Sequence, residues 1–116
     1  MTIRSTMTEN SAVVKMAGTM AAGDFSNLHG HLLGLLQARR RKIVLDFEDV
    51  EHVDFKDASS LAREFELVRS YNGNMKVAGL SPYVRNILLF AGLSDFLDAN
   101  MTGHAMLDPA RTPQAS

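Results

Sequence analysis

The chain alternates between short apolar runs and longer segments in which apolar residues recur every three or four positions. The short runs are Ala12 to Ala17, Lys42 to Phe47 and Met75 to Leu80. Their length and β-branched residues predict strands, and the longer segments between them predict helices. Strands that alternate with helices form βαβ units, in which the strands are parallel and the crossovers are right-handed. The pattern therefore predicts an α/β fold, with a mixed, mostly parallel central sheet and helices packed on it.

We expect three helices, each with a recognisable start. Asp24 is suited to be the N-cap of the first helix. Asp54 opens the second, with Asp57 three residues later in a capping-box-like arrangement. Ser81-Pro82 starts the third, because serine caps a helix and proline suits its first position. The residues expected to face the core include Phe25, Leu28, Leu32 and Leu35, then Ala58, Leu61, Phe65 and Val68, then Val84, Ile87, Leu88 and Ala91.

Glycines mark several expected ends of these elements. Gly18 is predicted to end the first strand run, and Gly92 to end the third helix. Gly73 is suited to a left-handed cap after the second helix. Val50 and Val53 are expected in a loop behind the second strand run.

Less regular segments are expected at the two ends of the chain. Residues 3–7 predict a short edge strand, and Leu93, Phe96 and Leu97 predict an apolar clasp followed by a last short strand. We expect one domain over residues 1–107 and a disordered tail over residues 108–116.

The composition excludes several kinds of chemistry. There is no cysteine, so a thiolate nucleophile, a disulfide and a cysteine-ligated metal are ruled out. His29 and His31 are two residues apart and diverge on a helix, so they cannot share a metal. The sequence has no P-loop, no dinucleotide-binding glycine motif and no nucleophile elbow. We therefore expect no catalytic residue, no cofactor, no metal and no enzymatic activity.

Charge and hydropathy also bear on partners and compartment. The net charge is −1, and the one basic cluster is residues 39–42. We expect these side chains to lie at the C-terminal end of a helix, where they interact favourably with the helix dipole. We therefore expect no nucleic-acid partner. No apolar run approaches the ~20 residues that a membrane span needs. We expect a cytoplasmic protein without direct membrane insertion.

Four segments carry a more specific pattern. They are Val44-Leu45-Asp46-Phe47, Val53-Asp54, Gly73 before the run from Met75 to Leu80, and Ser81-Pro82-Tyr83-Val84-Arg85 leading to Gly92-Leu93. Together they resemble the STAS family, which includes the bacterial anti-sigma factor antagonists. The resemblance covers roughly residues 12–107, and its most specific part is the Ser-Pro segment.

The resemblance implies a small STAS-type domain that acts in signalling and transcription regulation by binding a protein. The implied partner is an anti-sigma factor, a kinase-like regulatory protein or another protein partner. In the family, the first serine of an Asp-Ser-Ser-Gly loop is phosphorylated, which switches binding off. The alternative that the resemblance leaves open is an assembly subunit of a stress-signalling complex or of a transport ATPase, including lipid-transport machines.

This chain departs from the family at that loop. Asp54 keeps the aspartate, but Phe55 stands at the phosphoacceptor serine, Lys56 at the second serine and Asp57 at the glycine. Phenylalanine has no hydroxyl, so the usual phosphoswitch cannot operate there. The partner-binding residues that we expect are Asp54, Phe55, Lys56, Asp57, Ser59 and Ser60.

Two points about this loop stay open in the sequence. Phe55 is either an exposed aromatic anchor for a partner or a side chain tucked against the sheet. Ser59 and Ser60 are either ordinary helix-surface serines or phosphoacceptors in a shifted register.

Overall fold

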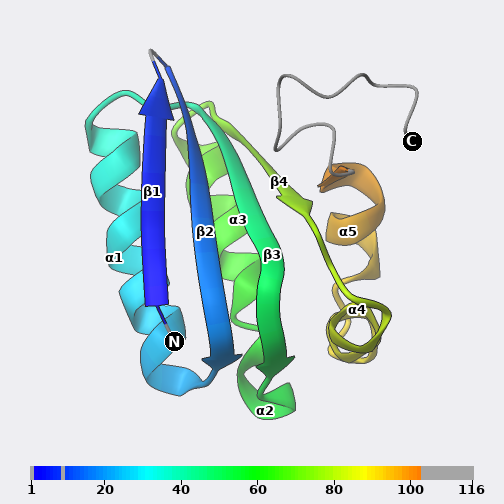
Figure 1. Ribbon diagram of the computed structural model, residues 1–116. Coiled ribbons are helices and arrows are strands. Elements are labelled where there is room, and N and C mark those ends of the chain that lie inside the picture. The colour runs from blue at the N-terminus through cyan, green and yellow to red at the C-terminus, as the bar shows by residue number, and fades with distance from the viewer. Residues whose placement is uncertain (1, 9, 103–116) are drawn as a thin grey trace, which may run out of the picture.

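A computed structural model describes residues 2–8 and 10–102 of the chain (Figure 1). The elements are, in chain order, β1 (Thr2–Thr8), β2 (Ser11–Met20), α1 (Ala22–Gln37), β3 (Lys42–Val53), α2 (Phe55–Ala58), α3 (Leu61–Ser70), β4 (Asn74–Ala78), α4 (Pro82–Phe90), α5 (Ser94–Asn100) and β5 (Met101–Thr102).

The strands form one sheet in the order β1-β2-β3-β4-β5. β1 runs antiparallel to β2, and each of the other neighbouring pairs is parallel. This arrangement confirms the predicted mixed, mostly parallel α/β sheet. It also confirms the edge strand expected over residues 3–7, which is β1, and the last short strand, which is β5.

The helices α1 and α3 lie side by side behind the sheet in Figure 1, while β1, β2 and β3 are open toward the viewer. The inner side chains of the strands and helices are buried between these two layers, and Leu45, Leu61, Phe65, Val77 and Leu88 are all at most 3% exposed. Burial of this apolar layer is the main contribution that stabilises the fold.

The strands β2 and β3 are both longer than expected. β2 does not end at Gly18 but continues to Met20, with shifts in its register against β3 on either side of Ala17 and Gly18. Val50 and Val53 do not lie in a loop, because β3 extends to Val53 and both side chains are buried. The prediction failed because Glu48 and Asp49 interrupt the apolar run at exposed positions, although the strand pairing continues past them.

The first helix also starts earlier than expected. α1 begins at Ala22, and its N-cap is Ala21, which has no side-chain oxygen to offer. Asp24, predicted as the N-cap, is instead the third residue of the helix, and its carboxylate accepts a hydrogen bond from the Ala21 amide at 2.9 Å. At the other end, the Arg41 guanidinium donates to the Leu36 carbonyl at 2.6 Å, as expected for the basic cluster.

The segment predicted as a single second helix is divided in two. α2 ends at Ala58, and Ser59 and Ser60 separate it from α3. The left-handed residue after α3 is Asn72, with φ 60°, and not Gly73. Gly73 is required for a different reason, since a Cβ there would lie 2.7 Å from the Arg41 carbonyl oxygen.

The C-terminal half follows the sequence prediction more closely. Ser81 caps α4 by accepting a hydrogen bond from the Val84 amide at 3.1 Å. Leu93 and Leu97 are buried, and Phe96 stacks on Phe65 with ring centroids 5.2 Å apart, which confirms the apolar clasp. β4 ends at Ala78, two residues before the predicted end, because Gly79 has φ 75°. The predicted tail, residues 108–116, and the predicted domain end at residue 107 lie outside the described residues.

Leu45→Ala should lower the free energy of unfolding by about 2–5 kcal/mol, because Leu45 is fully buried in the central strand. Val44→Ala is the matched control, because Val44 precedes Leu45 in β3, faces the open side of the sheet and is only half-buried. The free energy of unfolding should fall by about 1 kcal/mol in this variant. Urea unfolding followed by circular dichroism measures both. Equal losses for the two variants would contradict the assignment of the core face.

Candidate partner-binding surface

The candidate surface is the end of the molecule at which β2 and β3 finish and α2 begins. The Asp54 amide donates to the Met20 carbonyl at 2.8 Å, which joins the two strand ends. The Asp54 side chain accepts a hydrogen bond from the Lys56 amide at 3.1 Å and so caps α2. Ala58 is buried and anchors the other end of this short helix. The backbone of α2 is therefore held at three points.

The predicted site residues divide between two sides of α2. Phe55 is 55% exposed, and Lys56 and Ser59 are also exposed. Asp57 and Ser60 are half-buried and line a groove next to α1. Phe55 is thus exposed and not tucked against the sheet, so the tucked alternative is wrong. The six residues do not form a single patch.

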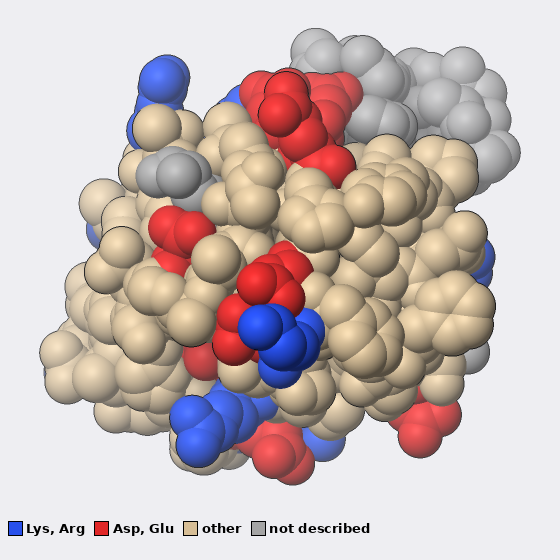
Figure 2. Space-filling view, turned by 90° about the horizontal axis from the view of Figure 1, so that it is seen from below, with Lys and Arg blue, Asp and Glu red and all other residues tan. Residues whose placement is uncertain are grey.

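Figure 2 views this end of the molecule directly. Acidic and basic side chains lie next to one another near its centre, and uncharged side chains make up most of the surface around them. Lys56 lies between Asp54 and Asp57 in the chain, so the charge of α2 is mixed and not strongly of one sign.

A second aromatic feature near α2 was not predicted as part of the site. His52, near the end of β3, and Tyr83, in the first turn of α4, stack with ring centroids 5.6 Å apart. The His52 Nδ1 and Tyr83 hydroxyl are 2.6 Å apart in a hydrogen bond. Tyr83 is 55% exposed, and α4 packs against α2. The sequence signal was weak, since it consisted only of an aromatic residue directly after the Ser-Pro helix start.

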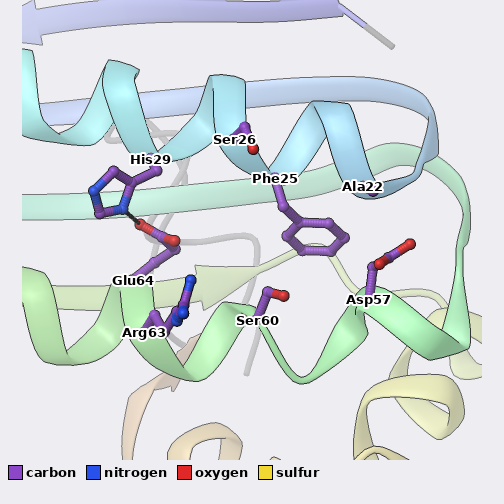
Figure 3. Close-up of a pocket in the computed structure, with 8 residues that line it drawn as sticks. All are labelled: Ala22, Phe25, Ser26, His29, Asp57, Ser60, Arg63 and Glu64. Atoms are coloured by element: carbon purple, nitrogen blue, oxygen red, sulfur yellow. Dashed lines mark hydrogen bonds and ion pairs between the residues drawn. The ribbon is translucent and has the colours of Figure 1, made fainter.

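The groove on the other side of α2 has a volume of about 280 Å³ and lies between α1 and the α2–α3 segment. Figure 3 shows its lining, in which the side chains of His29 and Glu64 point toward each other across the groove. The lining residues are Ala22, Phe25, Ser26, His29, Asp57, Ser60, Arg63 and Glu64.

The polar contact in this groove is the pair formed by His29 and Glu64. The His29 Nδ1 lies 2.9 Å from a Glu64 carboxylate oxygen, and the Glu64 side chain is 3% exposed. Burial raises the pKa of Glu64, while the hydrogen bond from His29 partly offsets that increase. The pair links α1 to α3 and is an ionisable contact in this groove.

The histidines do diverge on α1, as predicted. His29 faces Glu64 of α3, whereas His31 contacts the Ser5 hydroxyl of β1. Within residues 2–8 and 10–102, no three histidine or acidic side chains come together as a metal site would require. None of the helices described is long and apolar enough to cross a membrane.

The open face of the sheet carries the buried aspartate of β3. Asp46 accepts a hydrogen bond from the Glu48 amide at 2.8 Å, and its second oxygen lies 3.4 Å from the Lys15 amine. A hydrogen bond to Asp49 raises the pKa of Lys15, with Asp46 adding to the effect. Asp46 is therefore held by structural contacts.

The comparisons with known proteins agree with this architecture. Residues 3–102 match the family model described as Mlab, STAS domain. No curated protein matches the sequence significantly.

Solved structures with the same fold include anti-sigma factor antagonists. The unphosphorylated form of the anti-sigma factor antagonist SpoIIAA has a TM-score of 0.72 at 15% identity, and the match covers 98% of this chain and 91% of that chain. The phosphorylated form of SpoIIAA, described as a Bacillus cell fate determinant, also matches, with a TM-score of 0.69 at 16% identity. A putative anti-sigma factor antagonist from Thermotoga maritima has a TM-score of 0.73 at 14% identity, covering 94% and 95%. One from Mycobacterium paratuberculosis has a TM-score of 0.68 at 19% identity, covering 83% and 81%.

Glu64→Gln should change how stability depends on pH. The folded protein holds the Glu64 proton more tightly than the unfolded chain, whose glutamate has the ordinary pKa of 4.5. The stabilisation from this proton is complete below that pH and is lost as the pH rises through the raised pKa. Wild type should therefore lose stability relative to Glu64→Gln as the pH rises above 4.5 and through the raised pKa of Glu64.

Urea unfolding of both proteins across this pH range measures the effect. Glu66→Gln, which changes an exposed glutamate of the same helix, is the control and should follow wild type. A difference in the free energy of unfolding between wild type and Glu64→Gln that is the same at every pH would show that burial does not raise the pKa of Glu64.

Proposed function

Because this chain belongs to the STAS domain family, we propose that it is a non-enzymatic regulatory module that binds a protein partner through the surface around α2. The observation that carries this proposal is Phe55, a phenylalanine that is 55% exposed at the first position of a capped helix. An exposed aromatic side chain on a rigid backbone loses little conformational entropy when it is buried by a partner.

The neighbouring side chains suit the same role. Tyr83 offers a second exposed aromatic ring, held in place by its stack with His52. Aromatic residues are enriched among the side chains that dominate binding energy at protein interfaces. The opposite charges of Asp54 and Lys56, the chain neighbours of Phe55, would lie beside its ring and contribute to specificity more than to affinity.

We propose that binding is constitutive and not switched by phosphate at the usual position. SpoIIAA exists in unphosphorylated and phosphorylated forms, but Phe55 provides no hydroxyl at the corresponding position of the family loop. Ser60 is a poor substitute, because its side chain is half-buried in the groove next to α1 and is therefore less accessible to a kinase.

The partner that we propose is an anti-sigma factor or a kinase-like regulatory protein, met in the cytoplasm. The second candidate is an assembly subunit of a stress-signalling complex or of a transport ATPase. The absence of a hydroxyl at Phe55 favours this second role, since a contact without a switch suits a permanent subunit. Both candidates use the same surface and differ in the identity of the captured protein.

Phe55→Ser should weaken partner binding by about 1–2 kcal/mol or more, because it removes the aromatic anchor. Its effect on the free energy of unfolding should stay within about 1 kcal/mol, since the side chain is exposed. The measurement is quantitative capture from the native cell extract, with the captured proteins identified by mass spectrometry. Phe90→Ser is the matched control, because Phe90 is 81% exposed at the far end of α4.

Equal recovery of the partner by Phe55→Ser and wild type would show that the partner does not bind through Phe55 and would contradict the proposed interface at α2. The intact mass of protein purified from its native cells tests the absence of a switch. A stoichiometric phosphate on Ser59 or Ser60 would contradict constitutive binding and indicate a switch in a shifted register.

A further inference from the structure

The outer edge of β1 is unpaired within the described part of the chain. β1 is seven residues long, and its register against β2 is continuous. Proteins usually protect such an edge with proline, bulges or several charges. β1 contains no proline and only one charged residue, Arg4. It is therefore a free edge that can accept another strand.

The hydrogen-bonding groups that face outward can be identified from β2. The Lys42 amide of β3 donates to the Asn10 carbonyl at 3.1 Å, so even-numbered residues at the start of β2 face β3 and odd-numbered residues face β1. These odd-numbered residues pair with even-numbered residues of β1, as Ser11 does with Thr8. The alternation of an antiparallel ladder then directs the remaining amides and carbonyls of β1 to the outer edge. They belong to Ile3, Ser5 and Met7.

The side chains of the same three residues lie on the helix side of the sheet and are only partly covered. Ile3 and Ser5 are half-buried, and Met7 is 50% exposed. α1 packs against β2 and contacts β1 through His31 and the Ser5 hydroxyl. The helix layer therefore leaves room beside β1 for another apolar side chain.

We propose that a second copy of this chain pairs with β1, so that two antiparallel β1 strands join the two sheets into one. With Ser5 opposite Ser5 of the second copy, all seven residues overlap and the outward groups of both strands meet. Ile3 then lies opposite Met7 of the second copy, and Arg4 opposite Thr6 of the second copy. The strand is thus complementary to itself, as a two-fold interface requires. A register shifted by two residues gives a shorter ladder. In one direction the shift also places Arg4 opposite Arg4 of the second copy, and two like charges directly opposite each other are destabilising.

The flank of α1 next to β1 is compatible with this pairing. A two-fold axis perpendicular to the sheet puts both helix layers on the same side and brings the two α1 helices together. The residues that follow His31 on this flank are Gly34 in α1 and Ala38, the C-cap of that helix. A Cβ added at Gly34 would meet nothing within 4 Å, so there is open space next to the helix at this position. Small residues let two helices approach closely.

The dimer would leave the α2 surfaces free. β1 is paired antiparallel, so the ends that carry α2 point in opposite directions, and each copy can bind a partner. The dimer does not depend on the identity of that partner or on Phe55.

The first test is sedimentation equilibrium of the full chain, with any tag at the C-terminus, over micromolar to millimolar concentration. Ser5→Pro removes the outward amide at the two-fold axis but no hydrogen bond to β2, and proline is tolerated at such an edge position. It should raise the dissociation constant of the dimer at least about tenfold. Ser5→Ala is the matched control: it also loses the hydroxyl contact with His31 but keeps the amide, so it should dimerise like wild type. A monomeric wild type, or a Ser5→Pro variant that dimerises equally well, would overturn the proposal.

The second test is disulfide crosslinking, which remains informative even if Ser5→Pro unfolds. The chain has no cysteine of its own. Ser5→Cys places two thiols on residues whose Cα atoms would be about 5.5 Å apart, within disulfide range. Thr8→Cys places them about 20 Å apart in the same dimer, since the two copies of Thr8 lie six residue steps apart along the ladder. Crosslinking through Ser5→Cys alone is expected. Equal crosslinking through both variants, or none through Ser5→Cys, would overturn the pairing.

Discussion

The long parallel pairing of β2 with β3 is the contact on which the rest of this structure depends. It runs from Ser11 and Lys42 to Met20 and Val53, and the Asp54 amide continues it by bonding to Met20. Because both strands finish together, the chain leaves them at one end of the sheet, where α1 and α2 begin. The register of this one ladder thereby determines that the first turns of two helices are neighbours.

Placing the two helix starts together has two consequences for the surface. Phe55, directly after the capping Asp54, cannot reach the core from a four-residue helix that is anchored through Ala58, and it stays exposed. On the other side, α1 and α3 approach each other closely enough for His29 to bond to the buried Glu64. The same arrangement therefore gives an exposed aromatic on one side of α2 and an ionisable contact in a groove on the other.

The two surfaces that we propose as binding sites lie apart on the molecule. The α2 surface is built from side chains on a rigid turn, whereas the β1 edge offers backbone groups of a strand held only by β2 in the described residues. A partner that binds α2 must match side-chain shape and charge, and a strand that binds β1 needs mainly a free, extended backbone. These two kinds of recognition need not compete, since one lies at an end of the sheet and the other along its side.

The sequence by itself determined the alternation of strands and helices up to α4, the mostly parallel sheet and the buried positions such as Leu45 and Phe65, because these follow from apolar periodicity and local capping. Its resemblance to the STAS family also predicted that Phe55 stands where the family has a phosphoacceptor serine. Only the tertiary structure decided that β3 continues through Glu48 and Asp49 to Val53, because pairing with β2 outweighs the polar interruption. It decided as well that Phe55 is exposed and that His52, Tyr83, His29 and Glu64 contribute to the surface and the groove. Those contacts join residues 31 and 35 positions apart in the chain. No local sequence pattern specifies such contacts, and they form only when the packed layers bring the residues together.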